Sequence, residues 1–248
     1  MISLKTKEEL RSMAEGGRML SEVMKELKKN VAPGIREKEL DALAGKLIKE
    51  KGAQIAFQGY HGFPGNICVS VNEQVVHGVP TERTLKEGDI VSLDIGLIWK
   101  GLYLDMARTF PVGKVDPEAS RLVRVAKTAL RLGVKKAKPG NTIGDLGNTI
   151  QRYVEGQGYG IVRELCGHGI GRDLHEDPQI PNYGQRKTGE KLKEGMVICI
   201  EPMITAGAYH LKLEKDGQTY STRDEKLSAH FEDTIAITAS GPKVLTRD

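Results

Sequence analysis

The phrase LKEGDIVSLD, residues 85–94, returns later in the chain as LKEGMVICIE, residues 192–201. Each copy ends on an acid that lies inside an apolar run: Asp94 in the first and Glu201 in the second. An ionised carboxylate in a buried strand is costly unless a positive partner meets it. Two such acids at matching places of a duplicated framework therefore predict a shared cationic centre, most simply a metal site between two halves.

Other short phrases repeat at nearly the same offset. Ala32-Pro33-Gly34 matches Lys138-Pro139-Gly140, and His61-Gly62 matches His168-Gly169. Each Pro-Gly follows a lysine-rich helical pattern and precedes a second amphipathic stretch. The repeat is too long for a solenoid unit, and no linker-like tract separates its copies. We therefore expect one domain, residues 1–248, whose halves, about 1–111 and 112–248, are related by a pseudo-two-fold axis.

The composition is that of an ordinary globular protein. The 248 residues are 39% hydrophobic and 28% charged, which argues against disorder. Neither a membrane-length apolar run nor a secretory signal is visible in the sequence, and the three cysteines suit free thiols in a reducing cytoplasm. The net charge of +4 is mild. Lysines near two predicted helix ends fit solvated helix termini, or a weak attraction to RNA such as a ribosome surface.

The apolar periodicity predicts helices and strands in the same order in both halves. Helices are expected over residues 6–30, 36–51, 118–138 and 142–157. Strands are expected over residues 66–76, 90–99, 102–111, 196–205 and 230–238. The order helix, helix, strands, taken twice, predicts an α+β fold: a curved, mostly antiparallel sheet with paired helices on its outer face.

A pair of acids follows from the turn between two of these strands. Trp99-Lys100-Gly101 looks like a tight hairpin turn, which would place Asp94 and Asp105 on one face of the sheet as close cross-strand neighbours. Two carboxylates that close repel each other unless a cation lies between them. A shared proton or backbone N–H donors are the alternatives.

Three further side chains extend this set. Glu201 shares a strand face with small residues, and Glu232 begins another strand, while Asp233 points to the opposite face. His168 lies between glycines that let the backbone approach closely, although a structural role for this histidine stays open. Four carboxylates are too many for one catalytic ion and suit two ions about 3.5–4 Å apart. Oxygen and nitrogen ligands without thiolate favour Mn, Fe, Co or Zn.

These residues resemble a known family. Asp94, Asp105, His168, Glu201 and Glu232, in this order and spacing, are similar to the dinuclear metal set of the methionine aminopeptidases. The surrounding phrases are closer still: NICVSVNE (66–73), VHGVP (76–80), GHGIG (167–171), LHEDP (174–178) and IEPM (200–203). The resemblance spans nearly the whole chain and points to the short bacterial type I form. It implies the pita-bread fold, whose halves are related by a pseudo-two-fold.

The resemblance also implies residue roles. Asp94 would bind one metal, Asp105 and Glu232 would bridge both, and His168 and Glu201 would complete the shell of the other. Glu201 would serve as general base and acid for a water or hydroxide that bridges the metals.

Substrate contacts are implied in the same way. His77 would hydrogen-bond the scissile amide, and His175 would contact a backbone carbonyl of the substrate. Tyr60, Phe63, Cys68 and Leu174 would line the pocket for the methionine side chain. The chain departs from the family pattern at Phe57, Leu174 and Gln218, where a small thiol, an aromatic ring and a tryptophan are frequent. These differences bear on the shape of the pocket.

The function expected from the resemblance is removal of the initiator methionine from nascent chains whose second residue is small. The resemblance also implies two divalent ions, a cytoplasmic location, a monomeric state and weak ribosome association. It implies no DNA or membrane partner. A proline dipeptidase of the same fold uses the same ligand types, but that family usually carries an additional N-terminal domain. A pita-bread protein retained as a binding module for RNA or protein generally lacks the ligands present here.

Overall fold

The computed structural model describes residues 2–247, and its helices match the predicted ones to within two residues. The four α-helices of this range are α1 (Lys7–Asn30), α2 (Glu37–Glu50), α3 (Pro117–Lys136) and α4 (Ile143–Gly156). Local sequence fixes where they begin. Thr6 and Glu9 form a capping box on α1, and Thr142 and Asp145 form one on α4, so that first-turn N–H groups gain acceptors.

Most strands of residues 2–247 join one large, mainly antiparallel sheet. Its path runs β1-β4-β5-β14-β9-β7-β8, with β2 attached to β4 and β15 attached to β14. Its members are β1 (Gln54–Ile55), β2 (Cys68–Val71), β4 (Ile90–Trp99), β5 (Leu102–Pro111), β7 (Gly167–Gly169), β8 (Glu176–Ile180), β9 (Val197–Ile200), β14 (Glu232–Thr238) and β15 (Gly241–Val244).

Two small sheets complete the strands of the described chain. One has the order β13-β10-β6 and the other the order β11-β12-β3. Their members are β3 (Gln74–Val76), β6 (Gly160–Ile161), β10 (Met203–Thr205), β11 (Leu211–Leu213), β12 (Tyr220–Thr222) and β13 (Ser228–His230).

Three of the predicted strands were wrong as continuous elements, because the chain changes sheet within each. Residues 66–76 divide into β2 and β3 around Asn72, whose φ is 57°. Residues 196–205 divide at Glu201 and Pro202, and residues 230–238 divide at Phe231. Pro202 has no N–H to continue the ladder. Both breaks let the chain pass between the large sheet and the β13-β10-β6 sheet.

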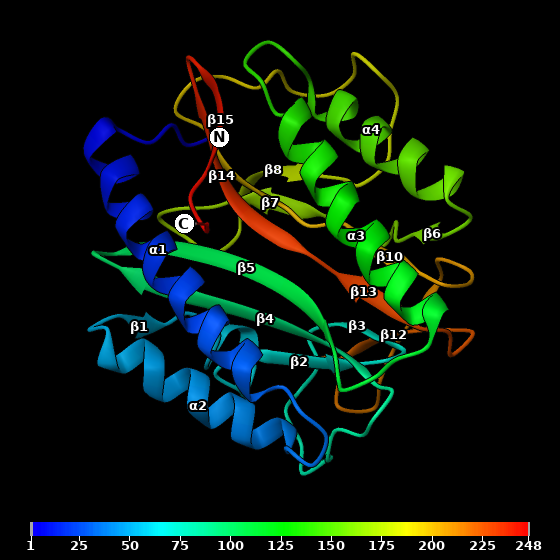
Figure 1. Cartoon of the computed structure of the whole chain (residues 1–248). Helices are drawn as coiled ribbons and strands as arrows, with labels where there is room; N and C mark the ends of the chain where they lie inside the picture. The colour runs from blue at the N-terminus through cyan, green and yellow to red at the C-terminus, as the bar shows by residue number, and fades with distance from the viewer. Residues whose placement is uncertain (1, 248) are drawn as a thin grey trace.

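The predicted two-fold arrangement is confirmed. The pair β5–β14 joins the halves at the centre of the large sheet, and β4 and β9 flank it at equivalent places. Figure 1 shows α1 and α2 beside the strands of the first half, and α3 and α4 over those of the second. One sequence match is not structural: His61 is exposed in a short 3₁₀ turn (Tyr60–Gly62), whereas His168 lies within β7.

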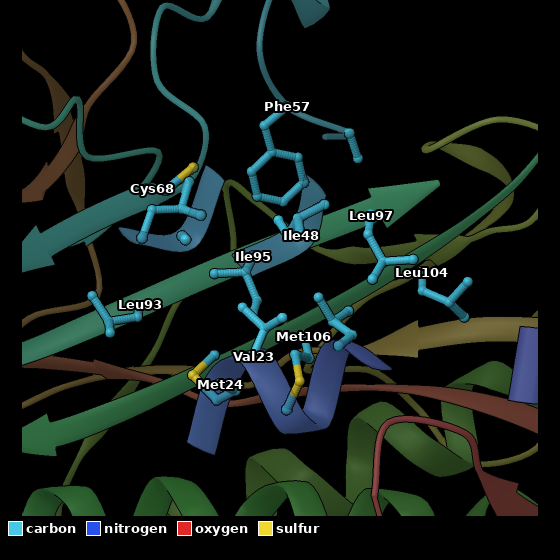
Figure 2. Packing of buried hydrophobic residues seen from close by; sticks show 14 of the residues in the cluster. Val23, Met24, Ile48, Phe57, Cys68, Leu93, Ile95, Leu97, Leu104 and Met106 are labelled. Atoms are coloured by element: carbon cyan, nitrogen blue, oxygen red, sulfur yellow. The ribbon is translucent and has the colours of Figure 1, made fainter. Parts of the chain in front are cut away.

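Strand alternation separates the helix-covered face from the face that carries the acids. Leu93, Ile95 and Leu97 of β4 belong to the hydrophobic cluster that includes Val23 and Met24 of α1, as Figure 2 shows. In the second half, alternate isoleucines of β9 and β14 pack with α3 and α4: Ile198, Ile200, Ile235 and Ile237. Since side chains alternate along a strand, Asp94 of β4 and Glu232 of β14 point to the opposite face of the sheet from these residues. Burial of each such aliphatic side chain contributes roughly 1.5–3 kcal/mol.

Helix α1 packs closely against the C-terminal segment of the chain. A Cβ at Gly17 would lie 2.1 Å from the carbonyl oxygen of Leu245, so only glycine fits there.

Across residues 2–247, no helix is both long enough and apolar enough to cross a lipid bilayer.

Candidate metal centre and substrate cavity

Three of the four acids lie on adjacent strands of the large sheet, Asp94 on β4, Asp105 on β5 and Glu232 on β14, and Glu201 directly follows the next strand, β9. Asp94 pairs with Ala107, and Gly96 pairs with Asp105, so Asp94 and Asp105 are diagonal neighbours on one face. Ala107 also pairs with Glu232 on its other side. Asp233 pairs with Ile200, which brings Glu232 beside Glu201 where β9 ends. The sheet register therefore gathers acids from both halves of the chain.

The predicted hairpin supplies the first half of this register. Trp99 pairs with Leu102, and the two residues between them, Lys100 and Gly101, have φ values of 52° and 76°. Positive φ at both central positions is the turn geometry that matches strand twist. The prediction that this turn places Asp94 and Asp105 on one face is confirmed.

His168 reaches the same place from β7. Its Nε2 lies 3.6 Å from Oε1 of Glu201, and its Nδ1 lies 2.9 Å from the carbonyl oxygen of Gly169. A Cβ at Gly167 would lie 2.3 Å from the carbonyl oxygen of Cys199, and one at Gly169 would lie 2.1 Å from that of Asp177. The flanking glycines therefore let the strands approach closely enough to bring the imidazole to the acids.

Two groups of potential ligand atoms lie close together. One atom from each of Asp105, His168, Cys199 and Glu232 lies within 4.8 Å of the others, and the same holds for Glu201, His230 and Glu232. The Cys199 sulfur also lies 3.7 Å from Oγ1 of Thr234. Glu232 belongs to both groups and therefore links them.

Several buried carboxylate oxygens in this cluster lack hydrogen-bond partners. Within residues 2–247, one carboxylate oxygen each of Asp94, Asp105 and Glu232 is buried and has no hydrogen-bond partner. Buried oxygens left unpaired are costly, and this argues against the alternative in which backbone N–H groups satisfy these acids. Bound divalent cations would supply the missing partners, so the residues present fit such ions.

The electrostatics point the same way. Burial raises the pKa of Asp94 to about 7. Burial, followed by the charges of neighbouring acids, raises the pKa values of Asp105, Glu201 and Glu232 well above their ordinary range. Burial lowers the pKa of His168 to about 3, which leaves a neutral imidazole. Acids whose ionisation is disfavoured without a positive partner, beside a neutral nitrogen donor, are the groups that a bound cation would suit.

The acids lie at one side of a cavity of about 520 Å³. All of the predicted substrate-binding side chains line it: Tyr60, Phe63, Cys68, His77, Leu174 and His175. The hydroxyl of Tyr60 lies 3.1 Å from Nδ1 of His175, and the rings of His175 and His168 meet edge to face at 4.4 Å. His77 has φ 57°, and burial lowers its pKa to about 4. The structure therefore brings the predicted substrate residues to the same hollow as the acids.

The departures from the family pattern also lie at this cavity. A Cβ at Gly96 would be 2.6 Å from the ring of Phe57, so Phe57 occupies the face of β4 that carries Asp94. Figure 2 shows Phe57 across the strands from Met24 of α1. Nε2 of Gln218 lies 3.4 Å from the carbonyl oxygen of His61.

Sequence reasoning missed several residues of the site. Val76, Gln179 and Met203 line the cavity, and His230 is buried beside Glu201 and Glu232. The only sequence signal for His230 is its place two residues before Glu232, since residues so spaced share a face of a strand. That signal was obscured because the chain changes sheet at Phe231.

Comparison with known proteins agrees with this geometry. Residues 11–239 match the model of metallopeptidase family M24. The chain belongs to metallopeptidase family M24, and it is a metal-dependent hydrolase. It is 49% identical to methionine aminopeptidase 1 of Bacillus subtilis, over the full length of both chains.

Solved structures of related proteins resemble it as well. The crystal structure of methionine aminopeptidase from Thermotoga maritima matches all of both chains with a TM-score of 0.98 and 42% identity. A prolidase from Pyrococcus furiosus matches with a TM-score of 0.81 and 27% identity, over 99% of this chain and 65% of that one. The pita-bread fold is thereby confirmed, and within the family the chain is a methionine aminopeptidase, an enzyme that removes N-terminal methionine.

Proposed function

We propose that Asp94, Asp105, His168, Glu201 and Glu232 hold two divalent ions. The observation that carries this proposal is the set of buried, unpaired carboxylate oxygens that meet from both halves of the sheet. Four carboxylates carry more negative charge than one divalent ion balances. Oxygen donors with one imidazole suit Co, Mn, Fe or Zn.

His168 suits the role of a nitrogen ligand. Its Nδ1 faces the carbonyl oxygen of Gly169 at 2.9 Å, which fixes the proton on Nδ1 and leaves the Nε2 lone pair toward Glu201. Histidines that bind metals commonly donate their other ring N–H in this way. The imidazole therefore arrives with its tautomer and ring orientation already set.

Proton transfer is the proposed role of Glu201. Ions bound here would lower the pKa of water and polarise the scissile carbonyl. Glu201 would take up a proton on a carboxylate oxygen as water adds to that carbonyl, and would return it to the leaving amine. Its place in the wall of the cavity gives the carboxylate access to a bound peptide.

Two histidines would orient the peptide. His77 would donate to the scissile amide and stabilise the negative charge that develops on its oxygen. His175 would contact a backbone carbonyl of the substrate, and the hydroxyl of Tyr60, 3.1 Å from its Nδ1, limits the ring's rotation. Because both rings line the cavity that the acids border, a bound peptide can meet all of them together.

The methionine side chain would occupy the apolar part of the cavity. Tyr60, Phe63, Cys68 and Leu174 supply aromatic, aliphatic and sulfur surface that suits a flexible thioether. The substrates we propose are nascent polypeptides and peptides that begin with methionine and have a small second residue.

Metal titration of the apo-enzyme tests this function. Methionine release from Met-Ala-Ser should rise with added Mn(II) or Co(II), while Leu-Ala-Ser and Met-Leu-Ser should be cleaved at least tenfold more slowly. Xaa-Pro dipeptides provide a third arm because the prolidase shares the fold. Faster turnover of Xaa-Pro than of Met-Ala-Ser, or release of methionine independent of metal, would refute the proposal.

We further propose that residues 1–248 act as a single catalytic domain, monomeric and cytoplasmic, with weak ribosome association. The central pair β5–β14 supports a single domain, because it ties both halves into one sheet. Lysines in the last turns of α1 and α3 supply positive charge for contact with RNA. Light scattering would test the monomer, and co-sedimentation with ribosomes at increasing salt would test the association.

A further inference from the structure

His230 lies at the junction between two sheets with its backbone held firmly. It ends β13, pairs with Met203 of β10, and immediately precedes the segment that enters β14. Its backbone N–H donates to Oγ1 of Thr109 at 2.9 Å, and its carbonyl oxygen accepts from the same hydroxyl at 2.9 Å. The ring is 1% exposed, so its position is fixed inside the molecule.

The ring itself lacks partners. Among residues 2–247, neither Nδ1 nor Nε2 of His230 has a hydrogen-bond partner. Nε2 lies 3.7 Å from Oε2 of Glu201 and 3.9 Å from Oε2 of Glu232. These separations exceed a hydrogen bond by less than 1 Å, and a small contraction of the site would close one of them. An unpaired imidazole at this depth is costly.

Comparison with His168 indicates what kind of partner His230 is. His168 has its Nδ1 proton fixed by a backbone carbonyl and presents a lone pair at Nε2, as a ligand requires. Nothing in the described chain fixes the Nδ1 proton of His230. A neutral imidazole with its proton on Nε2 offers a donor to ionised carboxylates, which only accept.

The two histidines also lie nearest different carboxylate oxygens. His168 lies nearest Oε1 of Glu201, whereas His230 faces Oε2 of Glu201 and Oε2 of Glu232. We propose that His230 is a positioning residue that donates from Nε2–H to Oε2 of Glu201, with Oε2 of Glu232 as the adjacent acceptor, and so holds both carboxylates with their other oxygens toward the ions. This inference rests on the proposed metal centre.

Substitution of His230 tests the donor role. His230→Leu removes the N–H, whereas His230→Gln keeps an amide N–H at the end of a side chain of similar reach. Partners that orient metal ligands typically matter by about 10–100-fold in affinity or activity. We therefore expect His230→Leu to weaken Mn(II) binding to the apo-enzyme by about 10–100-fold in calorimetry. It should also lower kcat at saturating metal more than it changes KM.

The conservative variant and a spectrum make the test specific. His230→Gln should restore both quantities to within about tenfold of the wild type. The visible absorption bands of the Co(II)-loaded enzyme should shift in the Leu variant and return in the Gln variant. His210→Leu, at an imidazole whose side chain is 53% exposed, should leave all readouts unchanged. Wild-type metal affinity and kcat in His230→Leu, or equal losses in the Gln and Leu variants, would overturn the inference.

A measurement on the unaltered enzyme covers the case in which His230→Leu fails to fold. Nitrogen-15 NMR of the histidine-labelled, Zn(II)-loaded protein should show Nε2 of His230 protonated and Nε2 of His168 unprotonated. An unprotonated Nε2 at His230 would overturn the donor role. Glu201→Gln and His168→Ala, studied in parallel, distinguish a failure of the proposed metal centre from a failure of the donor role of His230. If they leave metal binding and turnover intact, the proposed centre itself is wrong; if only His230→Leu does so, the centre stands and this inference fails.

Discussion

Among single residues, Glu201 lies between two imidazoles. Oε1 lies 3.6 Å from Nε2 of His168, and Oε2 lies 3.7 Å from Nε2 of His230. The side chain of Asn182 donates to the carbonyl oxygen of Glu201 at 3.0 Å and fixes its backbone just where β9 ends. Its backbone and both of its oxygens therefore have defined neighbours, as the proposed role in proton transfer requires.

Replacing the Glu201 carboxylate by an amide tests its role as proton carrier. Glu201→Gln keeps the shape of the side chain but removes its basicity, so methionine release at saturating metal should fall by about 10²–10⁴-fold. Circular dichroism should show an unchanged fold. Glu194→Gln, an exposed acid of the same repeated phrase, is the matched control and should retain full activity. Turnover by Glu201→Gln at the rate of the control would contradict the assignment.

Loss of the His168 imidazole should act chiefly on metal binding. His168→Ala removes one nitrogen donor, so calorimetry of the apo-enzyme should show that binding of one Mn(II) equivalent weakens by more than the roughly 10–100-fold typical of residues that only orient a ligand. His210→Ala is the control, because that ring is half-exposed and is not among the described residues that line the cavity. Equal affinities of the two variants would show that His168 is not a ligand.

Among the elements, the N-terminal segment holds one wall of the cavity in place. Lys5, whose side chain is fully buried, pairs with Glu176 at the start of β8. The other oxygen of Glu176 accepts from the backbone N–H groups of Arg172 and Asp173, at 2.6 and 3.2 Å. These contacts tie down the loop that carries Leu174 and His175 to the cavity. The N-terminal segment thereby supports the loop that borders the proposed substrate cavity.

Breaking this ion pair should loosen the loop. Lys5→Met leaves the partly buried Glu176, whose side chain is 12% exposed, without its cation, so the free energy of unfolding should fall by up to about 3 kcal/mol. KM for Met-Ala-Ser should rise, since His175 and Leu174 lose their support, while Mn(II) affinity stays unchanged. Denaturant titration, steady-state kinetics and calorimetry measure the three quantities.

Two further variants make the Lys5 experiment decisive. Lys29→Met breaks an exposed pair with Glu26 and should change stability by less than about 1 kcal/mol. The double variant Lys5→Met with Glu176→Gln removes both buried charges and should regain part of the lost stability. An unchanged KM in Lys5→Met would show that the segment does not support the substrate site.

For the molecule as a whole, the proposed metal centre would join the two halves. Asp94 and Asp105 come from the first half, and Glu201 and Glu232 come from the second, on strands that meet at the pair β5–β14. The helices cover the opposite face of the sheet in both halves. Without a cation, four buried acids oppose the close approach of the halves. Metal binding should therefore stabilise the whole fold.

Metal removal tests this coupling. Treatment with a chelator should abolish methionine release and lower Tm, and added Mn(II) should restore both. A site saturated at 100 times its Kd adds about 2.7 kcal/mol to the free energy of unfolding, so Tm should rise steadily with the free metal concentration. Asp105→Asn should reduce this dependence. A Tm unaffected by metal, in an enzyme whose activity requires it, would show that the ions do not link the halves.

The duplicated architecture and the set of acids can be read from the amino-acid sequence alone. The repeated phrase located Asp94 and Glu201, helix periodicity located four helices, and the turn at Lys100-Gly101 fixed the register of Asp94 and Asp105. These features depend on short-range patterns: apolar spacing, helix caps and turn geometry. The family resemblance added His77, His175 and the side-chain pocket, all of which line one cavity.

The points at which the chain leaves one sheet for another follow from its three-dimensional packing and are not visible in the sequence. The breaks at Pro202 and Phe231 divide two predicted strands into β9 and β10 and into β13 and β14. The second break places His230 beside the acids. The pairing of Lys5 with Glu176 likewise joins residues far apart in the chain. Such contacts depend on how the halves pack, because burial and partner choice are set by the whole core and not by local periodicity.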